Sequence, residues 1–436
     1  MRWTFWTSIG LLALALSACA ALSSSKGGPA LSLPPAAAER DATEGPTLAT
    51  KASATPSTLL RTGPSPSAVP TPPPTLLPEE PPPAGAESQF RTDFGKHSVP
   101  YSEILPGGPP KDGIPAIDEP QFVGIEEADQ WLEPQEPVVL VQVGDEARAY
   151  PVQILMWHEI VNDTVGGVPV TVTFCPLCNT GVAFQRTLEG QVLDFGTTGR
   201  LRFSNLLMYD RQTETWWQQA TGEAIAGEFT GRQLTFLPAS MISWADFKEA
   251  YPDGTVLSRE TGYSRNYGRN PYTGYDDLNR SPFLYDGPQT PGTLPPMARV
   301  VTVDLNGEAV GYPYDVLQKV HVVNDTVGGL PIVVLWAPGT ASALDADSVA
   351  GGEDVGAATT FSRQLDGQTL TFLFDSDRGW RLDEQSGSQW DVLGQAVSGP
   401  LAGSQLTPVV SINHFWFSWA AFRPETRVYS LNQPNP

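Results

Sequence analysis

The sequence predicts a mainly β protein with a minor helical content, built as two homologous small domains of barrel-like or sandwich-like form. Three observations lead to this prediction. The N-terminal quarter is rich in Pro and poor in aromatic residues, the rest consists of short alternating segments between turn residues, and a series of motifs occurs twice. Short strands separated by turns at regular spacing are typical of barrels and sandwiches.

Residues 1–18 have the features of a signal peptide, namely a basic Arg2 followed by an apolar run. The run ends in Leu16-Ser17-Ala18-Cys19, which resembles the lipobox of bacterial lipoproteins, where the Cys becomes lipidated. We therefore expect an extracytoplasmic lipoprotein of a bacterial cell envelope, anchored to its membrane through Cys19. The alternative is an ordinary secretory signal followed by an incidental Cys.

Residues 19–96 are expected to form a disordered tether behind that anchor. The chain contains 42 Pro among 436 residues, and most of the surplus falls here among Ala, Ser and Thr. Such a composition buries too little apolar surface to offset the entropy of ordering the chain.

The charge of the chain excludes several classes of protein. The net charge is −22, and the N-terminal 96 residues are neutral overall, so the folded part carries the acidity. A body this acidic is repelled by nucleic acid, which excludes a nucleic-acid binder. No second long apolar run follows residue 18, which excludes a protein with several membrane spans.

The duplication rests on four matches that keep their order along the chain. A repeat this long indicates two homologous domains rather than a solenoid. We place the first domain at 97–280, a linker at 281–296 and the second domain at 297–436. The matched segments are 144–151 with 306–313, 160–170 with 322–332, 222–227 with 394–399, and 244–247 with 419–422.

Alternation and β-branched residues predict the strands, and turn residues separate them. Asn162 to Gly167 has the composition of a turn, with two glycines that permit positive φ. Helices are expected only at 151–157 and 243–250. Strands are expected at 138–143, 168–174, 181–186, 192–197, 206–210 and 233–237.

The two copies differ at one conspicuous motif. The first copy contains Cys175-Pro176-Leu177-Cys178 directly after a predicted strand, and the second has Ala337-Pro338-Gly339-Thr340. Three hypotheses fit a lone Cys-x-x-Cys: a structural disulfide, a redox pair, or part of a metal site. A turn and a strand follow the motif, so the helix start of thioredoxin-like proteins is missing.

His158 is the candidate partner of the two cysteines. It lies 17 residues before Cys175, and a hairpin through Gly166 and Gly167 would bring the two segments together. In the repeat, His158 is replaced by Val320, and His321 falls opposite Glu159. Two thiolates and an imidazole suit copper or zinc.

Several further side chains receive provisional roles. We assign Glu159, Asn162 and Asp163 to a supporting shell, the last two first of all as turn formers. His97 and His414 are interpreted as bystanders. The segment 261–275, with four Tyr and two Arg, is interpreted as a linker whose tyrosines pack on the body; the alternative is a cover over the cysteine site.

The first copy resembles the family called domain of unknown function 3179 over about 112–275, and the second copy resembles it more faintly. Some members of that family are described as possible selenoproteins, and a selenocysteine in this motif would imply redox chemistry. The motifs that carry the resemblance are Tyr150-Pro151, Trp157-His158-Glu159, Asn162-Asp163, Phe174-Cys175-Pro176-Leu177-Cys178, Met208-Tyr209-Asp210-Arg211-Gln212-Thr213 and Tyr267-Gly268-Arg269-Asn270-Pro271-Tyr272.

The leading hypothesis is a thiol–disulfide oxidoreductase that uses Cys175 and Cys178, with His158 as proton acceptor or electrostatic partner. The second is copper or zinc bound by the same three residues. The third is a non-enzymatic binding module of the envelope, in which the cysteines only staple the fold. The sequence names no substrate and no redox partner.

Overall fold

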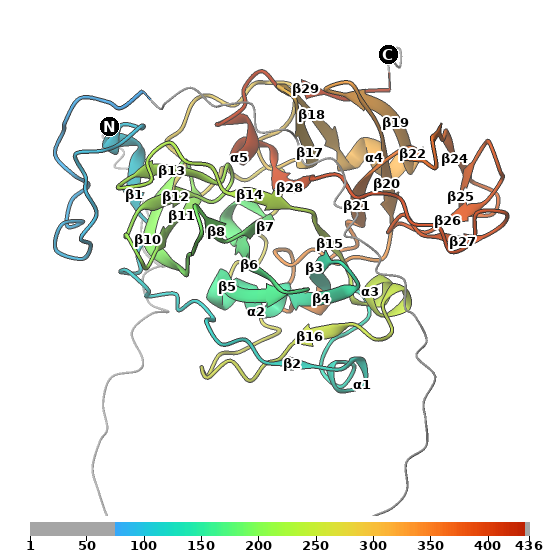
Figure 1. The fold of residues 1–436 in the computed structure, drawn as a ribbon, viewed down its shortest axis with the longest axis horizontal. Coiled ribbons are helices and arrows are strands. Elements are labelled where there is room, and N and C mark those ends of the chain that lie inside the picture. The colour runs from blue at the N-terminus through green and yellow to red at the C-terminus, as the bar shows by residue number, and fades with distance from the viewer. Residues whose placement is uncertain (1–74, 432–436) are drawn as a thin grey trace, which may run out of the picture. The chain divides into compact units, whose positions relative to one another are not determined.

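The computed structural model describes residues 75–431 (Figure 1). It is mainly β, with several sheets and a few short helices, as the sequence predicts. The sequence predicts barrel-like or sandwich-like domains, and the sheets within 75–431 are open paths that form no closed barrel. The helical segments are η1 (Tyr101–Glu103), α1 (Ile125–Ala128), α2 (Val152–His158), η2 (Pro176–Cys178), α3 (Trp244–Ala250), α4 (Tyr314–Val320), η3 (Val349–Gly351) and α5 (Trp416–Ala420).

One sheet spans both predicted domains. In Figure 1 the red strand β28 lies beside the green strand β7, and Asn413 pairs with Gly181. On its other side β28 pairs with β17, so a strand of the second half joins the two halves. In spatial order the sheet contains β29 (Arg427–Val428), β18 (Glu308–Pro313), β17 (Arg299–Leu305), β28 (Ile412–Phe415), β7 (Thr180–Gln185), β6 (Val168–Cys175) and β5 (Ile160–Val165), and β14 (Thr235–Leu237) also pairs with β7.

The remaining strands form smaller sheets. The first half contains the sheet β15 (Ala239–Ser243), β3 (Pro137–Val143), β4 (Glu146–Pro151), β16 (Thr255–Leu257), β2 (Phe122–Val123), and the sheet β1 (Ile104–Pro106), β10 (Phe195–Arg202), β11 (Asn205–Asp210), β12 (Trp216–Gln218), β13 (Glu223–Ala226). The second half contains β19 (Val322–Val327), β20 (Leu330–Ala337), β21 (Ala357–Ser362), and separately β24 (Phe372–Asp375), β25 (Trp380–Asp383), β26 (Gln389–Trp390), β27 (Ala396–Ser398). Two short ribbons complete the set, β8 (Thr187–Leu188) with β9 (Gln191–Val192), and β22 (Gln364–Leu365) with β23 (Gln368–Thr369).

Most of the elements that the sequence predicts are present, but the sequence does not predict the helices α1, α4 and α5. Helices α2 and α3 lie within a residue of the predicted segments, and the Ser243 hydroxyl caps α3 by accepting from the N–H of Asp246 at 3.0 Å. The predicted turn at 162–167 is mostly strand instead. Strand β5 continues to Val165, and only Gly166 and Gly167 turn, both with positive φ.

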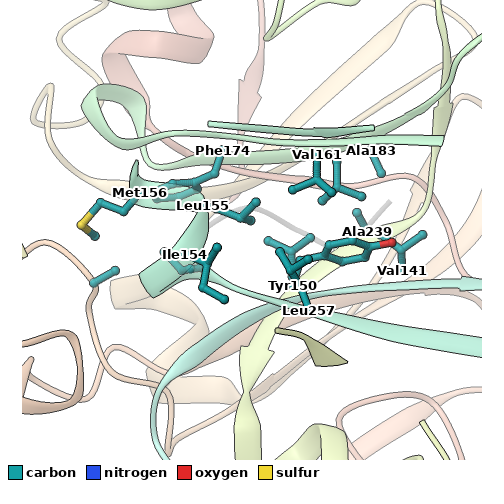
Figure 2. Packing of buried hydrophobic residues seen from close by; sticks show 14 of the residues in the cluster. Val141, Tyr150, Ile154, Leu155, Met156, Val161, Phe174, Ala183, Ala239 and Leu257 are labelled. Atoms are coloured by element: carbon teal, nitrogen blue, oxygen red, sulfur yellow. The ribbon is translucent and has the colours of Figure 1, made fainter. Parts of the chain in front are cut away.

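The core that positions the site lies between helix α2 and strands β5, β6 and β7. Leu155 and Met156 of α2 and Phe174 of β6 are buried in one apolar cluster, and Figure 2 shows them beside one another. Burying a side chain of this size contributes about 1.5–3 kcal/mol. The cluster therefore holds the end of α2 firmly against the end of β6.

Local arrangements recur in the two halves. The Tyr150 hydroxyl donates to Asp163 at 2.5 Å, and the Tyr312 hydroxyl donates to Asp325 at 2.7 Å. These hydrogen bonds occupy the positions that the sequence matches predict, 162 residues apart.

One of the four sequence matches has to be corrected. The N–H of Trp244 donates to the Glu136 carbonyl, and the N–H of Trp416 donates to the Ala298 carbonyl, both at 2.8 Å. The structure thus pairs Trp244 with Trp416, whereas the sequence match pairs it with Trp419. Two Trp residues stand three positions apart in α5, so sequence similarity alone favours the wrong one.

The packed body begins earlier than the sequence predicts. The sequence assigns residues 75–96 to the tether, yet Phe90 and Phe94 are buried against Trp216, with ring centroids 5.1 and 5.2 Å apart. His97 is also fully buried, and its ring nitrogens lie 2.9 Å from the Val99 carbonyl and 3.1 Å from the Pro78 carbonyl.

The predicted signal peptide, the lipidation site Cys19 and most of the predicted tether lie outside the described residues. Among residues 75–431, no helix combines the length and the apolar character needed to cross a bilayer.

Candidate functional site

The two cysteines lie in a tight turn between β6 and β7. Strand β6 ends at Cys175, η2 follows, and β7 starts at Thr180, which confirms the predicted order of strand, turn and strand. In a 3₁₀ turn, residues three apart stand on the same side. Both thiols accordingly point at the carbonyl oxygen of Ser204, with distances of 3.9 Å from Cys175 Sγ and 3.5 Å from Cys178 Sγ. They are free thiols, not a disulfide, and both are buried.

A strained hairpin turn orients the Ser204 carbonyl. Strands β10 and β11 are joined by Phe203 and Ser204 alone, since Arg202 pairs with Asn205. Both turn residues have positive φ, 53° and 64°, as a type I′ turn requires. Asn and Gly normally fill such a turn, so Phe and Ser are strained there.

A buried amide next to this turn contacts one thiol. The Asn205 Nδ2 group donates to Cys178 Sγ at 3.1 Å and to Gln219 Oε1 at 2.9 Å. Its Oδ1 atom accepts from the N–H of Ala220 at 3.0 Å, which fixes the orientation of the amide. Asn205 is thus placed to stabilise negative charge on the Cys178 sulfur.

The polar network continues into the second half of the chain. Gln219 Nε2 donates to the Thr180 carbonyl at 3.0 Å, and the Thr180 hydroxyl lies 2.8 Å from His414 Nδ1. Complete burial lowers the pKa of His414 to about 3, so its ring is neutral. His414, which the sequence analysis sets aside as a bystander, therefore belongs to the surroundings of the cysteine turn.

Glu159 is the ionisable group that the chain brings to Cys175. Its carbonyl accepts from the N–H of Phe174 at 2.9 Å, which places it opposite the end of β6. Its φ is 59°, although helices that end this way usually have Gly or Asn at that position. Burial raises the pKa of Glu159 to about 8. No hydrogen bond within residues 75–431 involves its carboxyl group.

The environment of Cys175 disfavours its thiolate. Burial raises the pKa of Cys175 well above its ordinary value, and the hydrogen bond and charge of Cys178 and the charge of Glu159 raise it further. The Cys175 thiol is therefore protonated in this state, and Glu159 is close enough to influence it electrostatically.

His158 does not face the cysteines. Its Nδ1 atom lies 2.8 Å from the Pro115 carbonyl, and its Nε2 atom lies 2.7 Å from the Tyr267 hydroxyl. Since a carbonyl only accepts, Nδ1 carries the proton and Nε2 accepts from Tyr267. Burial lowers the pKa of His158, which favours this neutral form. Because both ring nitrogens are occupied, His158 holds Tyr267 in place and does not contact a thiol.

The structure does not bring His158, Cys175 and Cys178 together as metal ligands. Among residues 75–431, no three side chains of His, Cys, Asp or Glu are grouped in a way that could hold a metal ion. Glu159, with its positive φ, ends the helix that carries His158, and the chain then continues into β5, the neighbour of the strand that ends at Cys175.

Asn162 and Asp163, predicted as turn formers, are strand residues with separate tasks. Asn162 exchanges hydrogen bonds with the backbone of Phe195, at 2.8 and 3.0 Å, and so ties β5 to β10. Asp163 pairs with Arg148 at 2.6 Å and accepts from Tyr150. Both support the fold around the site and neither contacts a thiol.

The Tyr-rich segment and the residues that follow it lie next to the cysteine turn; we call residues 261–285 the cap. The Ser204 hydroxyl donates to the Phe283 carbonyl at 2.6 Å, and the N–H of Phe283 donates to the Tyr275 hydroxyl at 3.1 Å. Burial raises the pKa of Tyr275, and the charges of Cys178 and Cys175 add to this rise. The end of the cap therefore lies beside Ser204 and close to the thiols, and Tyr267, Tyr272 and Tyr275 pack on the apolar core.

The family of the chain can now be stated. A sequence model described as "Protein of unknown function (DUF3179)" matches residues 111–426, so the chain belongs to the DUF3179 family. The match extends through the second half, beyond the 112–275 on which the resemblance rests. No curated protein and no solved structure matches the chain.

Sequence reasoning missed most of the shell around the thiols. Ser204, Asn205 and Gln219 are ordinary polar residues outside every predicted strand, and His414 lies 236 positions beyond Cys178. Only the pairing of β7 with β28 and the β10–β11 hairpin bring them to the cysteines.

Proposed function

We propose that Cys175 and Cys178 form a buried redox pair that cycles between a dithiol and a disulfide. The observation that carries this proposal is that both free thiols converge on one acceptor, the carbonyl of Ser204. Two sulfurs directed at one atom are near each other, and a short turn that keeps them there favours bond formation between them.

The chemistry balances with a disulfide as the oxidant. One thiolate attacks the partner's disulfide, forms a mixed disulfide and releases the first partner thiol. The other cysteine then attacks the mixed disulfide, closes the Cys175–Cys178 bond and releases the second partner thiol. The pair loses two electrons and two protons, and the partner gains both.

The shell suggests different roles for the two cysteines. Asn205 donates to Cys178 and not to Cys175, so negative charge is better stabilised on Cys178. Cys178 is therefore the attacking sulfur in this proposal. Glu159, with a pKa raised to about 8 by burial, lies on the Cys175 side and can accept the second proton in its ionised form, which predominates only above pH 8.

The burial of both thiols restricts the partner. Cys175 is 1% exposed and Cys178 is fully buried. No disulfide, whether of a protein or of a small molecule, reaches thiols this deeply buried while the cap is closed, so exchange with any partner requires the cap to open.

The same burial favours a second candidate, a non-enzymatic binding module. Cys175 and Cys178 belong to an apolar cluster with Ile160, Phe184 and Trp217. A buried free Cys behaves as a small apolar residue. Under this candidate the two side chains only fill the core.

The extracytoplasmic location remains a proposal supported by the sequence of residues 1–19. A lipid on Cys19 would hold the body at a membrane surface. The compartment would be oxidising, which supplies the disulfide state that the proposed cycle requires.

We also propose that the two halves descend from one duplicated unit. Tyr150–Asp163 and Tyr312–Asp325 are supporting evidence, as is a single family match that covers both halves. In this proposal the second half has lost the thiols and kept the framework.

The test is to titrate the wild-type chain in glutathione buffers and to measure its mass after alkylation. We expect a reversible loss of two hydrogens in the wild type. In Cys175→Ser we expect a mixed disulfide with glutathione instead, because the resolving thiol is gone. A wild-type pair that stays a dithiol at the most oxidising ratio would reject the redox function and leave the binding module.

A further inference from the structure

The second half of the chain supplies a loop that holds the cap. Strand β20 ends at Ala337 and β21 starts at Ala357, and we call residues 338–356 between them the latch loop. In the first half, the equivalent connection between β6 and β7 is the cysteine turn, residues 176–179. The latch loop of the second half therefore contacts the cap, which lies next to the cysteine turn of the first half.

Hydrogen bonds join the latch loop to the cap. Asn270 adds a side-chain bond, since its Nδ2 group donates to the Ala346 carbonyl at 2.8 Å while its Oδ1 atom accepts from the N–H of Tyr272. Four backbone hydrogen bonds join the two segments, from Gly274 to Asp345 at 2.6 Å, from Tyr275 to Leu344 at 3.0 Å, from Asn270 to Asp347 at 2.9 Å, and from Val349 to Gly268 at 2.9 Å.

Apolar side chains seal the same contact. Leu344 and Val349 of the latch loop are fully buried, and they share an apolar cluster with Tyr275 of the cap and Met156 of α2. Separating the loop from the cap would expose this cluster to water, which disfavours opening.

The cap is also attached at its other end. Tyr267 donates to His158 Nε2 at 2.7 Å and contacts the Thr261 hydroxyl at 2.5 Å. Residues between these anchors are exposed, among them Tyr263 and Asn266. The covered thiols thus lie beneath a segment that is fixed at a few defined points.

We propose that the latch loop gates access to the thiols, so that Cys175 and Cys178 react only when residues 268–275 separate from residues 338–356. The purpose of such gating rests on the proposed redox function, since it would limit oxidation to occasions when a partner opens the cap. The second half then regulates a site that it does not itself contain.

The test measures how fast each thiol is alkylated by N-ethylmaleimide in the folded full-length chain, with mass spectrometry of peptides. Asn270→Ala removes the side-chain bond to the latch loop. We expect both thiols to react about fivefold to tenfold faster, because opening becomes easier when one buried hydrogen bond is lost. Asn266→Ala is the matched control, since Asn266 lies in the same cap, is exposed and should leave the rate unchanged.

A second measurement needs no variant. Amide hydrogen exchange in the wild type reports how often the N–H groups of Gly274 and Tyr275 leave the latch loop. If the latch loop gates the thiols, the fraction of time for which these amides are open should equal, within about threefold, the fraction of time for which the thiols are accessible to alkylation.

The proposal is overturned if folded Asn270→Ala reacts at the wild-type rate. If that variant does not fold, hydrogen exchange in the wild type decides. The proposal is also overturned if the amides of Gly274 and Tyr275 open a hundredfold more often than the thiols become reactive. Alkylation reports exposure rather than electron transfer. A failed redox titration with an accelerated Asn270→Ala variant would therefore reject the redox function and keep the gate.

Discussion

At the scale of single residues, Glu159 is the most unusual side chain of the site. It combines a positive φ with burial and with a carboxyl group that forms no hydrogen bond inside residues 75–431. Gly at this position would remove the strain of the positive φ, and an apolar side chain would remove the cost of burying a carboxyl group. The positive φ recurs at His321, which ends α4, so it belongs to the fold; the buried carboxyl group whose charge acts on Cys175 is the feature typical of a functional position.

Glu159→Gln should stabilise the protein at pH 8 and have little effect near pH 4.5. The pKa is about 8 in the folded chain, against 4.5 for an ordinary Glu. Between these values the unfolded chain has released the proton and the folded chain keeps it, so stability falls as pH rises through this window. Thermal unfolding of both proteins at pH 5 and pH 8 should show a gain of at least about 1 kcal/mol at the higher pH only.

Glu189→Gln is the control for this effect. Glu189 also has a positive φ, 50°, but it is exposed. Its substitution should change stability equally little at both pH values. An equal gain in both variants at pH 8 would contradict the prediction that the buried charge of Glu159 lowers stability.

At the scale of elements, the β5–β6 hairpin determines which residue meets the cysteine turn. The sequence predicts this hairpin through its two glycines, and the structure confirms it. The sequence does not show that the register sets Glu159, and not His158, against the end of β6, because the register follows from backbone bonds such as that between Phe174 and Glu159.

The two glycines of this hairpin should differ in their sensitivity to Ala. A Cβ atom at Gly166 would lie 2.4 Å from the Val143 carbonyl oxygen, whereas a Cβ atom at Gly167 would have no atom within 4 Å. We expect Gly166→Ala to cost about 2–4 kcal/mol and Gly167→Ala about 1 kcal/mol, the ordinary cost of left-handed backbone. Chemical denaturation measures both, and equal costs would contradict the close approach of β3 to this turn.

At the scale of the whole molecule, the two halves depend on each other. Strand β28 lies between β17 and β7, and the latch loop fills the core beside helix α2. The sequence predicts two small domains from a repeat. A repeat shows that two segments are similar, but it does not show whether each one completes its own sheet.

Residues 75–296 expressed alone should therefore fail to fold. The edge of β7 would lose its partner, and the apolar cluster around Phe174 would lose Leu344 and Val349. We expect no cooperative thermal transition and rapid alkylation of both cysteines, while the chain 75–431 shows a transition and slow alkylation. A cooperative transition of the isolated half would contradict the shared sheet.

The sequence by itself determined the β-rich class, several strands of the first half and the helices α2 and α3, because alternation and turn residues act over a few neighbouring positions. It also determined the family and the cysteine turn, since both are local patterns. Only the tertiary structure decided the shell of the thiols. Asn205 reaches Cys178, and His414 reaches Thr180 at the end of the cysteine turn, through strand pairings across distant parts of the chain, and no local pattern encodes such pairings.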